Sequence, residues 1–211
     1  MGSVARWIYA AGLLVVFVLV YLVDERVARG TFLAASLFWI LVAPLWLARG
    51  VSARQRVALA TSGLLVLVPA ALALVLLRPA QVLQVLVLVW IADTAAYFVG
   101  RRWGRRKLAP SISPGKTWEG AWGGIAGAAV YAMIGGTFLT GIARLPAYLF
   151  IAVVLAAISI VGDLFESAAK RQAEVKDSGA LLPGHGGILD RIDSASAVLP
   201  VAALVLSYAR P

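Results

Sequence analysis

A run of charged residues late in the chain has the residue types of a site that handles a metal ion and phosphates. Six of the ten acidic residues and the only histidine fall between positions 163 and 193: Asp163, Glu166, Glu174, Asp177, Asp190, Asp193 and His185. Charge this dense beside strongly apolar segments is costly unless it has partners or a function. Because the chain has no cysteine, the ligands on offer are mainly carboxylate oxygens, which suit Mg²⁺.

Two aspartates of this run, Asp163 and Asp190, are the predicted metal ligands and catalytic residues. Mg²⁺ typically binds one or two protein carboxylates and completes its shell with water and substrate phosphates. We expect Asp163 at the end of one helix and Asp190 at the start of the next, so that the two carboxylates meet. Asp193 follows on the same helix face as Asp190, and it is predicted as a further ligand or as a neighbour of the ligands.

The same run carries cations and glycines that suit a phosphate group. Counter-charge would come from Lys170, Arg171, Lys176 and Arg191. His185 lies among glycines, and the backbone amides of Gly186 and Gly187 can approach a ligand closely, where the next helix begins. Positioning and charge neutralisation are what phosphoryl or nucleotidyl transfer requires, so we predict a catalytic role for His185 and for these cations.

A polar stripe should lead into this run. Asp163, Glu166, Ser167, Lys170 and Glu174 fall at i, i+3, i+4, i+7 and i+11, so they share one face if the helix continues. We expect that helix to end near residues 177–179, where Asp, Ser and Gly favour a turn. Glu174 is most simply solvated, and the neighbouring Lys176 and Asp177 form either a surface pair or part of the site.

A second charged stretch occupies residues 100–119. Its basic cluster consists of Arg101, Arg102, Arg105, Arg106 and Lys107. These charges either follow membrane topology and attract anionic lipid, or one or two of them touch the substrate. Residues 110–115 read as a loop from their turn residues.

The end of this stretch imitates a P-loop without matching it. Gly115, Lys116 and Thr117 resemble the last residues of that motif, but Pro110 stands where glycine is required and no preceding strand is expected. Thr117 can instead cap the next helix, with Glu119 favoured in its first turn. Lys116 would then be a mobile cation at a helix start, where a phosphate can bind.

Asp93 is the acidic residue that lies within an apolar segment, beside Thr94. A carboxylate there must face a partner or a wet cavity. It is either half of a structural ion pair with an arginine or a wall of the active cavity, and we include it among the predicted substrate-binding residues.

The elements that must position these residues are membrane helices. Hydrophobic residues make up 62% of the 211, and charges delimit seven apolar segments: 7–23, 30–48, 57–77, 80–100, 120–143, 145–162 and 194–209. Most reach the roughly 20 residues that a bilayer requires of a helix, and the last would begin within 188–193. Only helices satisfy their backbone within one segment in lipid. We therefore expect an all-α, polytopic membrane protein of about seven spans.

The chain is predicted to form a single domain, residues 1–211. Residues 1–77 would be N-terminal helices, and 78–211 a catalytic half with cytoplasmic loops at 100–117 and 166–187. The first apolar segment lacks a small-residue cleavage site and is expected to be a retained helix. The glycine-rich segment 120–143 should pack closely against its neighbours.

The net charge of +9 is explained by topology rather than by nucleic acid, and no nucleic-acid partner is expected. With the N-terminus inside and seven crossings, 14 of the 19 Lys and Arg residues fall on the inside, as the positive-inside rule requires. This arrangement places both charged stretches on the cytoplasmic face.

At these residues the sequence resembles the phosphatidate cytidylyltransferase (CDP-diacylglycerol synthase) family. The signature of that family, S-x-x-K-R, K-D, P-x-H-G-G and D-R-x-D, is matched from Ser167 to Asp193. Its preceding G-D-L-x-E-S is present at 162–167, A-D-T-x-A-Y-x-x-G-R at 92–101, and S-P-x-K-T-W-E-G at 113–120. The resemblance covers residues 90–193 closely.

The resemblance implies an enzyme that converts CTP and phosphatidic acid to CDP-diacylglycerol and pyrophosphate with Mg²⁺. It also implies a metal centre of one or two cations at Asp163 and Asp190, a homodimer surrounded by membrane lipids, and a multi-pass location in the cell membrane, the cytoplasmic membrane if the source is bacterial. The substrate-binding residues that it implies are Asp93, Ser113, Lys116, Thr117, Glu119, Ser167, Asp177, Gly186 and Gly187. Members of this family commonly carry about two more N-terminal helices than this chain is expected to have.

Three alternatives stay open. The acceptor could be another phosphorylated lipid, such as an ether-linked one. A cation-coupled transporter would suit the intramembrane aspartates, but most charge lies at one face and no two matching halves are visible. A catalytically inactive lipid-binding scaffold is disfavoured, because no charged position of the signature is missing.

Overall fold

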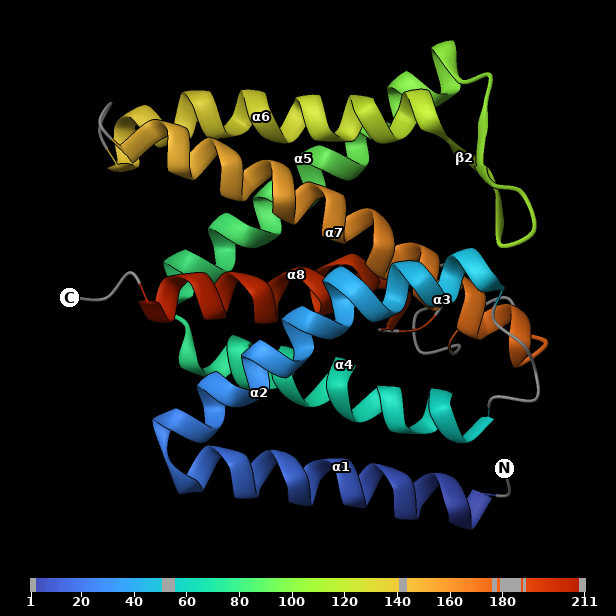
Figure 1. Cartoon of the computed structure of the whole chain (residues 1–211), viewed down its shortest axis with the longest axis vertical. Coiled ribbons are helices and arrows are strands. Elements are labelled where there is room, and N and C mark those ends of the chain that lie inside the picture. The colour runs from blue at the N-terminus through green and yellow to red at the C-terminus, as the bar shows by residue number, and fades with distance from the viewer. Residues whose placement is uncertain are drawn as a thin grey trace.

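The computed structural model describes residues 3–50, 56–140, 144–175, 178, 187 and 189–208. Figure 1 shows a bundle of long helices with one small hairpin at its edge. In chain order the elements are α1 (Ser3–Val23), α2 (Glu25–Leu37), the π-helix η1 (Phe38–Val42), α3 (Ala43–Arg49), α4 (Arg56–Leu76), α5 (Pro79–Trp103), β1 (Lys107–Ala109), β2 (Ser113–Thr117), α6 (Trp118–Thr140), α7 (Leu145–Gln172) and α8 (Leu189–Tyr208).

Five helical segments of the described chain are long and apolar enough to cross a membrane. They are Val4–Val23, Glu25–Arg49, Val57–Leu76, Pro79–Trp103 and Leu145–Gln172. The second is α2, η1 and α3 joined end to end. The glycine-rich α6 and the shorter apolar part of α8, Ile192–Tyr208, complete the bundle. The predicted all-α, polytopic class is confirmed, and α8 begins within 188–193 as expected.

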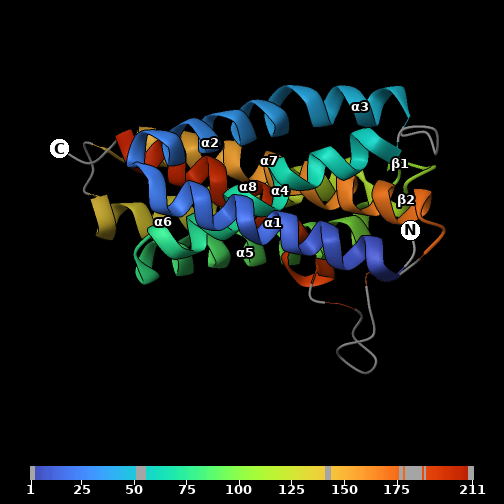
Figure 2. The ribbon, with the colours of Figure 1, turned by 90° about the horizontal axis from the view of Figure 1, so that it is seen from below.

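The described parts of both charged stretches lie at one end of the bundle. The N-terminus and the β1–β2 hairpin lie at the same end, and the C-terminus lies at the opposite end, in both Figure 1 and Figure 2. The end of α7 and the start of α8 are on the hairpin side in Figure 1. The hairpin, the end of α7 and the start of α8 therefore share one end of the helices, which agrees with the prediction that both stretches lie on one face.

The hairpin corrects one prediction. Strands β1 and β2 pair antiparallel, with Lys107 opposite Thr117 and Ala109 opposite Ser113. The interpretation of residues 110–115 as a loop was wrong for Ser113, Pro114 and Gly115, which belong to β2. Proline is tolerated there because each strand of a two-stranded sheet is an edge strand, with one side free of ladder hydrogen bonds.

The observed end of α7 corrects the prediction that this helix ends near residues 177–179. The helix ends at Gln172, about five residues before the expected turn. Glu174 adopts a left-handed φ of 57°, its N–H donates to the carbonyl of Arg171, and the N–H of Val175 donates to that of Lys170. This pair of bonds is a Schellman ending. Glu174 consequently lies outside the polar stripe of α7.

Small residues bring α5 and α6 into close contact, as predicted. A Cβ atom added at Gly123 would come within 2.5 Å of Val99, and one added at Gly124 within 2.9 Å of the carbonyl oxygen of Ala92. Ala128 and Ala132 of α6 are fully buried. Close packing of this kind is how helices associate in lipid, and it holds the Asp93 region of α5 beside the start of α6.

Candidate functional site

Side chains from four elements form a polar cluster, which consists of Asp93 (α5), Lys116 (β2), Asp163 (α7), and Asp193 and Ser194 (α8). Lys116 Nζ forms an ion pair with Asp163 Oδ2. On the other oxygen of the same carboxylate, Ser167 Oγ donates a hydrogen bond to Asp163 Oδ1 at 3.4 Å. The structure thus brings together Lys116 and Asp163, which are 47 positions apart and were predicted independently as phosphate-binding and metal-binding residues.

Asp93 belongs to this cluster rather than to an arginine pair. The side chain of Ser194 hydrogen-bonds to its carboxylate, and its charge interacts with those of Asp163, Lys116 and Asp193. Within the described residues Asp93 forms no ion pair with an arginine. The interpretation of Asp93 as half of a structural ion pair is therefore excluded for this part of the chain. Ser194, which is buried, was missed by the sequence analysis, because nothing in its own segment links it to Asp93.

A glycine sets the distance between the two helices that carry the aspartates. A Cβ atom added at Gly162 would come within 2.7 Å of Ala197 Cβ and 3.1 Å of the Asp193 carbonyl oxygen. The backbone of α7 therefore packs directly against α8 at this level. Because Asp163 follows Gly162, the close approach holds Asp163 beside Asp193, whose charges interact.

Further along α7, two residues of the polar stripe contact each other, and the neighbouring Arg171 contacts the hairpin. Lys170 Nζ lies 2.7 Å from Glu166 Oε2, one helical turn apart. Arg171 Nε donates to the carbonyl of Ile112 at 3.4 Å, between the two strands. Of the predicted phosphate-binding cations, Arg171 thus contacts the hairpin, whereas Lys170 is paired with Glu166 on its own helix.

The base of the hairpin is fixed by the start of α6. Glu119 Oε2 accepts hydrogen bonds from the backbone N–H groups of Arg105 at 3.0 Å and Arg106 at 3.2 Å, and these donors hold the pKa of the Glu119 carboxyl below its usual value. Thr117 Oγ1 accepts from the N–H of Gly120 at 3.1 Å, which confirms the predicted cap. Contacts of Ser113, Thr117 and Glu119 with a substrate stay predictions.

The five basic residues between the last turn of α5 and the start of β1 are exposed. Arg101 donates to the Tyr97 hydroxyl at 2.9 Å, and the guanidinium carbon of Arg102 lies 5.7 Å from the Trp103 ring centroid. In the described part of the chain none of the five pairs with an acidic side chain. Both interpretations of this cluster, lipid attraction and substrate contact, remain open.

Aromatic residues of the N-terminal region pack against the turn of α7 that carries Asp163. Phe165, two residues after Asp163, lies edge to face against Phe38, Trp39 and Trp46, with ring centroids 5.4, 5.5 and 5.6 Å away. Phe165 and Trp39 are buried. The sequence analysis assigned no role to the first 77 residues, but this packing fixes the turn of α7 that carries Asp163.

Several predicted residues fall outside the described structure. Lys176, Asp177, His185 and Gly186 are not described, and Asp190 and Arg191 are described only as backbone in the first turn of α8, whereas Gly187 is described and buried. Among the described residues, no three acidic or histidine side chains are grouped closely enough to hold a metal ion. The pairing of Asp163 with Asp190 around a cation therefore stays a prediction.

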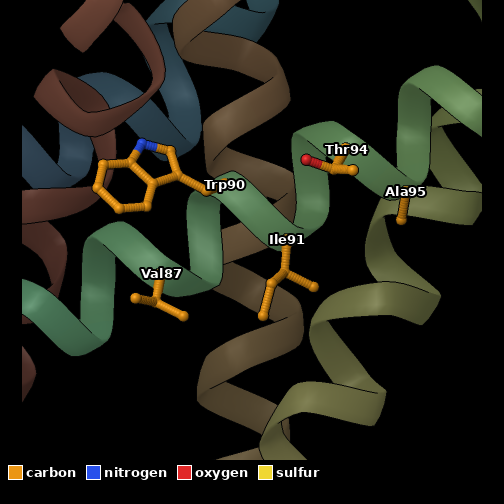
Figure 3. A pocket seen from close by; sticks show the side chains of 5 residues that line it. All are labelled: Val87, Trp90, Ile91, Thr94 and Ala95. Carbon is orange, nitrogen blue, oxygen red and sulfur yellow. The ribbon is translucent and has the colours of Figure 1, made fainter.

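A hollow of about 380 Å³ opens on the flank of α5 and is distinct from the polar cluster. Figure 3 shows its lining, which comes from α5 alone: Val87, Trp90, Ile91, Thr94 and Ala95. No charged side chain lines it. Its apolar character suits lipid contact, and we do not locate the chemistry there.

Comparison with known proteins agrees with these motifs. The chain is 43% identical over 211 residues to the phosphatidate cytidylyltransferase of Pseudomonas aeruginosa, a match that covers 95% of this chain and 77% of that protein. It is 51% identical over 122 residues to the enzyme of that name from Haemophilus influenzae and 47% over 125 residues to that of Bacillus subtilis. These two matches cover 56% and 57% of this chain but only 42% and 45% of those proteins.

The model of the cytidylyltransferase family matches residues 2–209, which include all four elements of the polar cluster as well as the N-terminal helices that support it. Since the match extends over nearly the whole chain, this protein belongs to the cytidylyltransferase family.

Proposed function

We propose that this protein transfers a cytidylyl group from CTP to phosphatidic acid, giving CDP-diacylglycerol and pyrophosphate, at the cytoplasmic face of the membrane. A phosphate oxygen of phosphatidic acid would attack the α-phosphorus of CTP, and the bond from that phosphorus to the bridging oxygen of the β-phosphate would break. The observation that carries the proposal is the polar cluster, in which Lys116 and Asp163 meet at one end of a membrane bundle. The names of the similar proteins support the choice of CTP and phosphatidic acid.

The oxygen donors of the cluster fit a hard divalent cation. Among the described residues, three carboxylates interact with one another and with Lys116, and the hydroxyls of Ser167 and Ser194 hydrogen-bond to two of them. Carboxylate-rich, cysteine-free sites of this kind suit Mg²⁺. Asp163 and Asp190 would hold it, with Asp193 beside them, and the bound ion would offset negative charge on the triphosphate.

The residues of the chain would act mainly by position and charge. Lys116 and Arg171 lie where the hairpin meets α7, and Lys170 precedes Arg171 on that helix. Their charges would bind the phosphates of CTP and the departing pyrophosphate. The lipid phosphate is already an anion, so no strong general base is required. Ser167 would hold the Asp163 carboxylate in orientation through its hydrogen bond.

An assay of the purified full chain in lipid nanodiscs tests the proposal. With CTP labelled at the α-phosphorus, phosphatidic acid and Mg²⁺, the label should pass to lipid and unlabelled pyrophosphate should be released. Asp163→Ala and Asp190→Ala should each reduce turnover by about 10²-fold or more, while thermal unfolding and size-exclusion profiles stay near those of the unaltered protein. Near-normal turnover of either variant would remove that residue from the metal site.

A lipid panel in the same assay tests the acceptor. We expect phosphatidic acid to accept the label and an ether-linked phosphorylated lipid to accept it poorly. The reverse preference would reassign the acceptor while retaining the nucleotidyl transfer. The absence of labelled lipid with every acceptor would overturn the proposed function. The expected homodimer can be measured on the same nanodisc sample by mass photometry.

A further inference from the structure

The ion pair between Lys116 and Asp163 occupies a carboxylate that the proposed reaction also requires. Lys116 Nζ contacts Asp163 Oδ2 directly, and the two side chains are only 26% and 29% exposed. The other oxygen of Asp163 already accepts a hydrogen bond from Ser167. A cation that binds Asp163 must therefore share this carboxylate with the ammonium group of Lys116.

An ammonium group and a divalent cation compete for the negative charge of this carboxylate. A carboxylate offers about four lone-pair sites, so both can reach it, but their positive charges would repel each other strongly there, because the site is only partly solvated. Binding of either cation to Asp163 consequently weakens binding of the other.

We propose that Lys116 is a built-in competitor for the cation at Asp163, and that it transfers to the phosphates of the nucleotide when the cation binds. This inference rests on the proposed function, because it assumes that a divalent cation binds Asp163. It adds an order of events, since Mg²⁺ alone must bind against the positive charge of a lysine, whereas Mg²⁺ accompanied by CTP offers that lysine a new anionic partner.

The hairpin explains why Lys116 is well placed for this exchange. The backbone on both sides of the hairpin base is tied down, by Glu119 to Arg105 and Arg106 and by Trp118 N–H to the carbonyl of Arg106. Thr117, the next residue, is buried. With the backbone fixed, the flexible lysine side chain alone can swing from the carboxylate to a nearby phosphate.

Binding of Mn²⁺ in the absence of nucleotide, followed by electron paramagnetic resonance on the full chain in nanodiscs, measures the competition directly. Lys116→Met should bind Mn²⁺ on the order of 10-fold to 100-fold more tightly than the unaltered protein, because a positive charge is removed from the site. Lys116→Arg keeps the charge and should bind Mn²⁺ about as weakly as the unaltered protein. Lys107→Met is the matched control, with the same charge change on the exposed strand opposite.

A second measurement uses the unaltered chain, so it does not depend on the folding of a variant. The rate at which an amine reagent acylates Lys116, read by peptide mass spectrometry, should rise several-fold as Mn²⁺ saturates the site. The rate at Lys107 should stay constant. Added CTP should then protect Lys116 again, because its ammonium group would be bound to phosphate.

The outcomes separate this inference from the function on which it rests. The competition would be overturned if Lys116→Met and the unaltered protein bound Mn²⁺ with equal, measurable affinity. It would also be overturned if the acylation rate of Lys116 did not change when Mn²⁺ binds. Either result would leave the proposed transfer in place. Failure of every variant to bind Mn²⁺, with or without CTP, would overturn both the cation site and the competition.

Discussion

Each oxygen of the Asp163 carboxylate has a different partner. Oδ2 pairs with Lys116, and Oδ1 accepts the hydrogen bond from Ser167 one turn later on α7. The serine therefore restricts rotation of the carboxylate while the charged partner is exchanged. A carboxylate held in one orientation loses less conformational entropy when it binds a cation, which is the advantage of preorganisation.

Glu119 offers a test of how the hairpin is attached. Its pKa is lowered by the N–H groups of Arg105 and Arg106, so the ionised form contributes stability above the ordinary glutamate pKa, and that contribution is lost as the pH falls through the lower folded-state value. We expect Glu119→Gln to lower the unfolding temperature at pH 7. The difference from the unaltered protein should shrink as the pH falls from about 5 to 3.

The control for this prediction is an acid without such donors. Glu25 pairs only with the exposed Arg29 on α2, and an exposed i,i+4 pair contributes little, so Glu25→Gln should leave the unfolding temperature nearly unchanged at every pH. A Glu119→Gln difference that persisted undiminished at pH 3 would show that the hydrogen bonds do not depend on the charge of the carboxyl group.

Local chemistry made some residues predictable and left others hidden. The cap formed by Thr117 and the stripe of Asp163, Ser167 and Lys170 follow from helix geometry, and both are present. The hydrogen bond from Ser194 to Asp93 joins α5 to α8 across the bundle. No spacing within one segment encodes a contact between residues 101 positions apart.

At the scale of elements, Gly162 controls the contact between α7 and α8. A methyl group there would meet Ala197 and the backbone of Asp193 at distances that force a shift. We expect Gly162→Ala to destabilise the fold by about 1–3 kcal/mol and to reduce transfer activity, because Asp163 would move away from Asp193. Thermal unfolding and the labelled-CTP assay measure the two effects.

Gly30 supplies the matched control, since it lies inside α2 and a methyl group there meets nothing within 4 Å. Gly30→Ala should be neutral or slightly stabilising, because alanine is favoured over glycine in a helix interior by about 1 kcal/mol. If Gly162→Ala were also neutral or slightly stabilising, the contact at Gly162 would not set the distance between α7 and α8.

Helix boundaries were predictable except where the backbone departs from regular geometry. The early end of α7 depends on Glu174 in a left-handed conformation, which an acidic residue adopts only occasionally. The aromatic support of Phe165 depends on η1, a π-helix that turns Phe38 and Trp39 into the core. Such π-segments are rare and often occur near functional sites, and apolar periodicity alone does not reveal them.

At the scale of the whole molecule, the polar cluster lies close to residues that favour a membrane boundary. Exposed tryptophans, Trp103, Trp118 and Trp122, cluster where α5 ends and α6 begins, and tryptophan favours the membrane–water interface. Asp93 lies ten residues before Trp103, or about 15 Å along the helix, which is deeper than these rings. A site at this depth can receive a lipid phosphate from the interface and a nucleotide from the water beyond it.

The orientation of the bundle can be measured because the chain contains no cysteine. Arg78 and Lys107 are exposed and flank α5, a helix about 37 Å long that exceeds the roughly 30 Å core of a bilayer. In spheroplasts of a bacterial expression host, an impermeant maleimide should label Arg78→Cys directly and Lys107→Cys only after permeabilisation. A permeant maleimide should label both.

The opposite pattern would put the polar cluster on the outer face, out of reach of cellular CTP. Labelling of both cysteines by the impermeant reagent would mean that α5 does not cross the membrane.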